Sequence, residues 1–170
     1  MEKESSKTSG GMGYGRFLAM IATSTLVMYG LMYLNTYETQ HIWFSQTRMW
    51  MALLMGAVMS VIMLGFMWSM YAKRAVNFAI LGISVAVFAG SLWLVRSQET
   101  VSDVSYMKAM IPHHSIAILT SRRAEISDPR VRELANGIIE AQLREIDEME
   151  DLIADIEANG DAAGEVAPVR

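Results

Sequence analysis

The chain has no cysteine, which excludes disulfide bonds, thiolate metal sites and cysteine nucleophiles. It also lacks the Gly-x-Ser-x-Gly elbow of serine hydrolases, the His-Glu-x-x-His pair of zinc peptidases and the Gly-x-x-x-x-Gly-Lys loop that cradles phosphates. A two-carboxylate active site stays open, although nothing in the sequence singles out a pair. We therefore expect a protein that is not an enzyme.

Charged residues are missing from three long stretches of the first half of the chain. Phe17–Leu34, Met49–Tyr71 and Ala75–Val95 contain no Asp, Glu, Lys or Arg. Each stretch is long enough, at about 1.5 Å per residue, to cross a hydrocarbon layer of about 30 Å. A soluble fold built from such helices would have almost no polar face. The sequence therefore predicts three transmembrane helices.

Basic residues flank these stretches unevenly. Three basic residues precede the first stretch: Lys3, Lys7 and Arg16. Lys73 and Arg74 lie between the second and third stretches, whereas the connection between the first and second carries only Arg48. Because cytoplasmic loops of membrane proteins carry an excess of Lys and Arg, the amino terminus is expected in the cytoplasm and the carboxy-terminal part outside it. We expect a bacterial inner (cell) membrane protein whose C-terminal domain is periplasmic or extracellular.

Composition divides the chain into four parts. We expect a cytoplasmic tail at residues 1–15, a transmembrane region at 16–96, a helical hairpin at 97–157 and a disordered tail at 158–170. Residues 96–170 hold eight Lys and Arg against fifteen Asp and Glu, a formal charge of −7. This acidic half argues against binding of nucleic acid or anionic lipid.

Capping residues delimit the two helices of the hairpin. The first is expected from about Ser102 to Ile126, with Ser102 or Asp103 as its N-cap, and the second begins at Asp128-Pro129 and ends near Gly160. Pro112 lies inside the first helix and is expected to kink it. The sequence has no Gly or Pro between Ser91 and Ile111, which leaves open a single helix that continues from the third membrane stretch.

Small residues recur every four positions in two of the membrane stretches. The two sets are Ala52, Gly56 and Ser60, and Gly82, Ala86 and Gly90. Such spacing lets membrane helices approach closely, so both sets are expected to lie at helix contacts.

Two thioethers and two imidazoles stand within eight residues of the first hairpin helix. They belong to Met107, Met110, His113 and His114. Thioether together with imidazole is a donor set that suits Cu(I). Zinc fits poorly without a third histidine, a cysteine or paired carboxylates in the cluster. The sequence therefore suggests a copper site, although methionines on an apolar face also serve simply as packing.

Helical phase gives this cluster an opposing face. One face of the first helix holds Asp103, Met107, Met110, His114, Ala117 and Ser121, with His113 on its flank. An apolar stripe of the second helix holds Val131, Leu134, Ile138, Met149, Leu152 and Ile156, with Gln142 and Glu145 near its middle. Because a buried carboxylate is usually paired or metal-bound, we expect Gln142, Glu145 and Met149 to face the histidines. In the alternative, Glu145 pairs with a histidine or arginine and Gln142 with backbone.

At these residues the sequence resembles the family called domain of unknown function 305. The pattern that carries the resemblance reads Asp103, Met107-Lys-Ala-Met-Ile-Pro-His-His114 and Ile138-Ile-Glu-Ala-Gln-Leu-Arg-Glu-Ile-Asp-Glu-Met149. It covers roughly residues 100–156. Ser115 departs from the family, which commonly has Gln at this position.

The resemblance implies a ferritin-like helical bundle, tied in some periplasmic members to copper binding and tolerance. It would make copper ligands of Met107, Met110, His113, His114 and Met149, with Gln142, Glu145 and Asp103 as possible supporting residues. Because one hairpin is half of a four-helix bundle and too small to bury much core, we expect a homodimer or higher oligomer.

We therefore expect an all-α protein with three transmembrane helices followed by an extracytoplasmic helical hairpin. It would bind copper, as Cu(I) or Cu(II), and possibly Ag(I), for buffering, tolerance or delivery. The alternative is a membrane-anchored interaction or scaffold module whose Met/His face is packed core and binds no metal. A third hypothesis is that the protein is a copper oxidoreductase.

Overall fold

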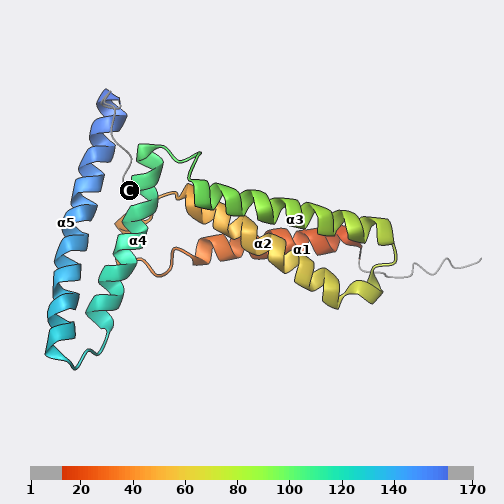
Figure 1. The fold of residues 1–170 in the computed structure, drawn as a ribbon, viewed down its shortest axis with the longest axis horizontal. Helices are drawn as coiled ribbons and strands as arrows, with labels where there is room; N and C mark the ends of the chain where they lie inside the picture. The colour runs from red at the N-terminus through yellow and green to blue at the C-terminus, as the bar shows by residue number, and fades with distance from the viewer. Residues whose placement is uncertain (1–12, 161–170) are drawn as a thin grey trace, which may run out of the picture. The chain divides into compact units, whose positions relative to one another are not determined.

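The computed structural model describes residues 13–160, and these residues form α-helices and short 3-10 helices without a strand (Figure 1). The prediction of an all-helical fold is confirmed. The elements are α1 (Tyr14–Leu31), η1 (Thr39–His41), α2 (Gln46–Phe66), η2 (Trp68–Met70), α3 (Arg74–Ser97), α4 (Asp103–Arg123) and α5 (Pro129–Asn159). Most of the two predicted tails, residues 1–12 and 161–170, lies outside the described residues.

The chain forms two units that are not continuous in sequence. The first contains α1, nearly all of α2, and α3. The second contains α4 and α5 together with residues 32–47, which connect α1 to α2. The predicted transmembrane region, residues 16–96, thus includes a segment that packs with the helices after residue 100.

The buried core of the first unit contains aromatic residues and lies at one end of its helices. Phe17, Leu64, Tyr71 and Ile80 form its buried core. The Tyr14 hydroxyl donates to Asn77 Oδ1 at 2.8 Å and accepts from the Lys73 N–H at 3.1 Å. The start of α1 therefore lies beside the connection between α2 and α3, so α1 runs antiparallel to α2 and parallel to α3.

Small residues bring α1 and α2 close together. Ala52, Gly56 and Ser60 of α2 are buried, and a Cβ on Gly56 would lie 2.4 Å from Thr25 Oγ1. The predicted contact role is confirmed for this set. It is wrong for the set on α3, which is exposed: Gly82, Ala86 and Gly90. Since α3 turns Asn77, Ile80, Ser84 and Ser91 inward, its glycine face points away from its neighbours.

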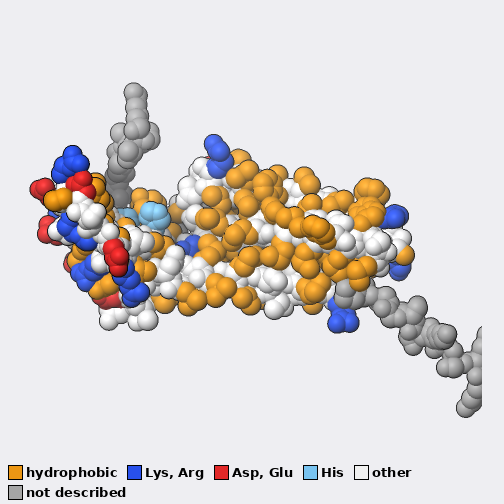
Figure 2. All heavy atoms as spheres, turned by 90° about the horizontal axis from the view of Figure 1, so that it is seen from below, with side chains coloured by type: hydrophobic (Ala, Val, Ile, Leu, Met, Phe, Trp, Pro, Cys, Tyr) orange, Lys and Arg blue, Asp and Glu red, His pale blue; other side chains and the backbone are white. Residues whose placement is uncertain are grey.

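Two helices are long and apolar enough to cross a membrane by length and composition, α2 and α3. The third predicted span, α1, is not one of them: it has 18 residues and carries Arg16 in its first turn. Figure 2 shows hydrophobic side chains over most of the visible surface of the three-helix unit. Acidic and basic side chains gather instead on the unit that contains α4 and α5.

The predicted caps of the last two helices agree with the structure, although α4 ends at Arg123 and not at Ile126. Ser102 caps α4, Asp128 caps α5 and Gly160 follows its last residue. Hydrogen bonds from the Arg130 side chain and backbone lower the pKa of the Asp128 carboxyl. The continuous helix left open by the sequence is wrong, because α3 ends at Ser97 and Gln98 adopts a left-handed conformation with φ of 54°.

Helices α4 and α5 pack side by side around a core of isoleucines (Figure 1). Its buried members are Met107, Ile111, Ile118, Ile146 and Ile153. The predicted stripe of α5 is wrong in part, because Val131, Leu134 and Leu152 are 45% to 64% exposed. Two apolar stripes run side by side along α5, and the one that contains Ile146 faces α4.

Candidate metal-binding site

His114 is fixed by hydrogen bonds at both ring nitrogens. Its Nδ1 lies 2.9 Å from the Met110 carbonyl oxygen, and its Nε2 lies 2.8 Å from Glu145 Oε2 on α5. Because a carbonyl oxygen only accepts, Nδ1 carries a hydrogen and donates it. Metal-bound histidines commonly donate one ring N–H to a carbonyl in this way, which leaves the other nitrogen for the metal. The atom left for a metal is Nε2.

A carboxylate and an amide surround that nitrogen. Glu145 faces Nε2, and Gln142 Nε2 donates to the same carboxylate oxygen at 3.5 Å. The His114 side chain is 13% exposed and the Glu145 side chain 43% exposed, so the pair lies at the edge of the helix interface. The predicted alternative for Glu145, pairing with a histidine, describes this arrangement. A cation at Nε2 would take the place of the proton shared with Glu145.

Two methionines lie one helical turn from the pair. Since α4 and α5 run antiparallel, the turn before His114 is level with the turn after Glu145. These turns carry Met110 and Met149, both partly buried. Met149 packs against the isoleucine core, whereas Met110 is not among the residues that pack there, so the two thioethers are level with His114 and Glu145 by helical register.

The structure separates Met107 and Asp103 from this place and leaves His113 exposed beside it. Met107 is 7% exposed and packs in the isoleucine core, about 10 Å along α4 from His114. Asp103 is exposed in the first turn of α4, about 16 Å along the helix. His113 is exposed, with its ring centroid 6.1 Å from that of His114. Packing alone accounts for the position of Met107.

The described residues bring together no group of three or more His, Asp or Glu side chains that could hold a metal ion. The possible metal donors level with His114 are the sulfur atoms of Met110 and Met149, the Glu145 carboxylate and the Gln142 amide. A site at this place would depend on thioethers, which bind soft ions such as Cu(I) in preference to Ca²⁺ or Mg²⁺.

Residues 94–166 match the family described as Domain of unknown function (DUF305). This part of the chain is a DUF305 domain. The resemblance drawn from the Met-x-x-Met-Ile-Pro-His-His segment is thereby confirmed. Uncharacterized protein L153 of Acanthamoeba polyphaga mimivirus is 36% identical over 73 residues, which are 42% of this chain and 48% of that protein. The chain thus spans about half the length of that relative. No solved structure gives a significant match.

Outside the matched residues, the segment 32–47 holds the DUF305 domain at Ser115. The buried Ser115 hydroxyl accepts the Tyr37 N–H at 2.6 Å and lies 2.9 Å from His41 Nδ1. His41 is itself buried. The residue that departs from the family pattern, next to His114, is therefore bonded to a part of the chain that the family does not cover.

Two aromatic rings of the segment 32–47 make cation–aromatic contacts with basic side chains of α4. The Arg122 guanidinium lies 4.7 Å from the Tyr37 ring centroid, and the Lys108 ammonium lies 5.4 Å from that of Trp43. Both rings also pack against the isoleucine core. Such cation–aromatic contacts stabilise by about 0.5–1 kcal/mol each at exposed sites.

Sequence reasoning missed these loop residues. Tyr37 and Trp43 fit the aromatic belt expected at a membrane surface, and His41 stands alone without a spaced partner. Helical phase does not apply to an irregular segment. The only available signal is the density of aromatic residues together with a histidine in a loop.

Proposed function

We propose that this protein is a membrane-anchored, extracytoplasmic copper-binding protein that buffers or delivers the metal and is not an enzyme. The observation that carries the proposal is His114, whose Nδ1–H is donated to a backbone carbonyl while Nε2 faces Glu145. Met110 and Met149, which are level with His114 along the helices, supply thioether donors. Soft ions such as Cu(I) and Ag(I) prefer such donors. His113, one position along, can add a second imidazole from the flank.

Membrane insertion of all three helices of the first unit belongs to this proposal. The long apolar helices α2 and α3 support it. The course of α1 supports the third span, because α1 begins beside the connection of α2 to α3 and approaches α2 again at Gly56. Lys73 and Arg74 at this connection favour a cytoplasmic location for it. Residues 32–47 and α4–α5 would then emerge together on the periplasmic or extracellular side of a bacterial inner membrane.

A homo-oligomer completes the proposal. The exposed stripe of Val131, Leu134 and Leu152 lies on the same face of α5 as Glu145, because positions 134, 145 and 152 differ by eleven and seven residues. A hollow of about 270 Å³ at one end of this face is lined by Val131, Leu134 and Ile138 among others. Two copies that join these faces would form a four-helix bundle and cover the donor residues.

Copper titration of the purified full-length protein tests the site. Against a competing chromophoric chelator, we expect one Cu(I) or Ag(I) per site and weak Zn(II) binding. His114→Ala and the double change Met110→Ala/Met149→Ala should each weaken Cu(I) binding by more than about tenfold, because outer-shell residues alone commonly contribute that much. Met107→Leu is the matched control and should change affinity less than about twofold.

Two outcomes would contradict the copper proposal: no stoichiometric soft-metal binding, or binding that is indifferent to all of these changes. Either would favour the interaction module, which the hydrogen bond of His114 to Glu145 and the buried Met107 also support. Oxidase activity of the copper-loaded protein would favour the oxidoreductase. Thermal unfolding of each variant separates loss of ligands from loss of folding.

The absence of cysteine makes the membrane topology directly measurable. Single changes Ser6→Cys, Glu38→Cys, Ser69→Cys and Glu125→Cys can be labelled in intact bacteria with a membrane-impermeant maleimide. We expect Glu38→Cys and Glu125→Cys to react from outside, and Ser6→Cys and Ser69→Cys to react only after lysis. Outside labelling of both Ser6→Cys and Glu38→Cys would show that α1 does not cross the membrane.

A further inference from the structure

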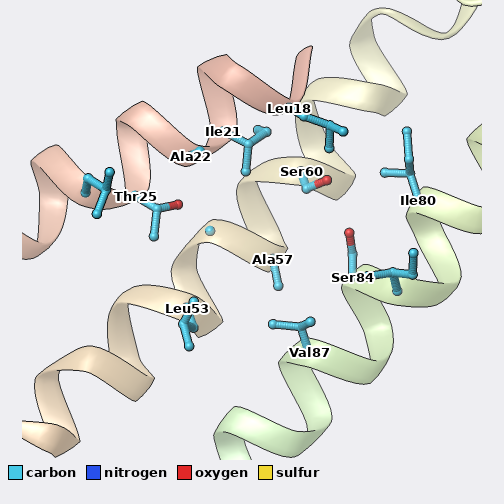
Figure 3. A pocket seen from close by; sticks show the side chains of 13 residues that line it. Leu18, Ile21, Ala22, Thr25, Leu53, Ala57, Ser60, Ile80, Ser84 and Val87 are labelled. Carbon is cyan, nitrogen blue, oxygen red and sulfur yellow. The ribbon is translucent and has the colours of Figure 1, made fainter. Parts of the chain in front are cut away.

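A cavity of about 550 Å³ lies among the three helices of the first unit (Figure 3). It is lined by Leu18, Ile21, Ala22, Thr25, Leu26, Leu53, Gly56, Ala57, Ser60, Ile80, Ile83, Ser84 and Val87. Ala57 of α2 and aliphatic side chains of α1 and α3 form its walls, and Thr25 fills the place beside Gly56. Its volume falls within the range of about 300–1,000 Å³ that is typical of small-molecule sites.

Two buried hydroxyl groups reach this apolar space from different helices. Ser60 of α2 is 6% exposed and Ser84 of α3 is 5% exposed, and Figure 3 shows both side chains at the cavity. Neither hydroxyl takes part in a hydrogen bond found among the described residues, and neither is one of the fully enclosed polar atoms without a partner, so both are accessible from the cavity. An unpaired hydroxyl in an apolar environment is unfavourable, so each gains from a partner inside the cavity.

Helix α1 is in close contact with α2 at one side of the cavity, which is open at the exposed residues Leu18, Leu26 and Ile83. A Cβ on Gly56 would lie 2.4 Å from Thr25 Oγ1, so the two helices cannot approach further without displacing Thr25. The cavity lining contains no methionine and no histidine. Soft-metal donors are therefore absent from it, and no methionine of α2 lines it.

We infer that this cavity binds a lipid-soluble small molecule whose apolar body carries a hydrogen-bond-accepting oxygen, such as a ketone. The aliphatic walls match the apolar body, and the Ser60 and Ser84 hydroxyls donate to the oxygen. A plain acyl chain would fill the same walls and leave both hydroxyls unpaired. The route of entry from the lipid phase rests on the proposed membrane location, which the cysteine-labelling experiment tests separately.

Benzophenone is a suitable probe because it is an apolar ketone that forms covalent adducts under ultraviolet light. With the full-length protein in lipid nanodiscs, we expect saturable labelling of one molecule per chain at residues of α1, α2 and α3 that line the cavity. Ser60→Ala and Ser84→Ala should each raise the half-saturating concentration by about fivefold, which is the loss expected for one hydrogen bond.

Ser91→Ala is the matched control, because Ser91 is buried on the same face of α3 but does not line the cavity. It should leave labelling unchanged. As competitors, fluorenone should displace benzophenone at lower concentration than fluorene, which has the same rings without the carbonyl. Equal competition by the two, or labelling that is indifferent to both serine changes, would overturn the inference and assign the cavity to acyl chains.

Discussion

Ile146→Ala is expected to lower the free energy of unfolding of the α4–α5 pair by about 3 kcal/mol. Ile146 is 2% exposed and packs among Ile111, Ile118 and Ile153. Removing buried methylene groups costs about 2–5 kcal/mol, because the lost contacts leave a cavity that the backbone closes only in part. Hydrogen exchange of α5 peptides at increasing urea concentration measures the change.

Leu134→Ala is the control, because Leu134 belongs to the α5 stripe that the sequence favours and the structure exposes. In dilute protein its effect should stay within about 0.5 kcal/mol. If two copies join through this stripe, the effect should grow with protein concentration, whereas that of Ile146→Ala should not. Light scattering should then show two chains per particle for the unaltered protein and one for Leu134→Glu. Equal destabilisation by Ile146→Ala and Leu134→Ala in dilute protein would contradict the observed packing.

Ser115→Ala should release residues 32–47 from α4 at a cost of about 2 kcal/mol. The change leaves the Tyr37 N–H and His41 without their shared partner, and an unsatisfied buried polar group costs about 1–3 kcal/mol. Hydrogen exchange at the Tyr37 amide reads this contact directly. We expect that amide to exchange at least tenfold faster in the variant.

Ser121→Ala controls for loss of a serine elsewhere on α4, since Ser121 lines the hollow and takes no part in the hydrogen bonds to Tyr37 and His41. It should leave exchange at Tyr37 unchanged. Exchange at Tyr37 that is equally unaffected by Ser115→Ala would show that aromatic packing alone holds the segment. Because Arg122 and Lys108 also contact this segment, Tyr37→Ala and Trp43→Ala would then be the informative changes.

Helix ends were predictable because capping is local. Ser102, Asp128 and Gly160 act within one turn of the chain, so their residue types are sufficient evidence. The break after α3 was not predictable in this way, because Gln98 adopts a left-handed conformation without the glycine that usually marks it.

The register of α5 is a case in which the sequence admits two answers. Val131, Leu134 and Leu152 form one apolar stripe, and Ile139, Ile146 and Ile153 form another beside it. The predicted stripe is the first one, but only the packing partner decides which one is buried. Met107 is a second example: helical phase places it on the same face as His114, but packing against α5 places its side chain in the core.

The meeting of His114 with Glu145 followed from phase, because two polar residues interrupted an apolar stripe opposite the histidines. The bond of Ser115 to His41 did not, because it joins irregular backbone to a helix across 74 residues. Periodicity carries no information about such pairs. Contacts of this kind emerge only from the three-dimensional fold.

The bond between Tyr37 and Ser115 spans 78 residues, and this separation sets an order of events during synthesis. At about 5–20 residues per second, the ribosome makes α4 about 4–16 s after the loop that packs against it. During that interval α2 and α3 are being made while Tyr37, His41 and Trp43 have no partner. The loop is thus the oldest part of the second unit, and it waits longer for its partner α4 than α4 waits for α5.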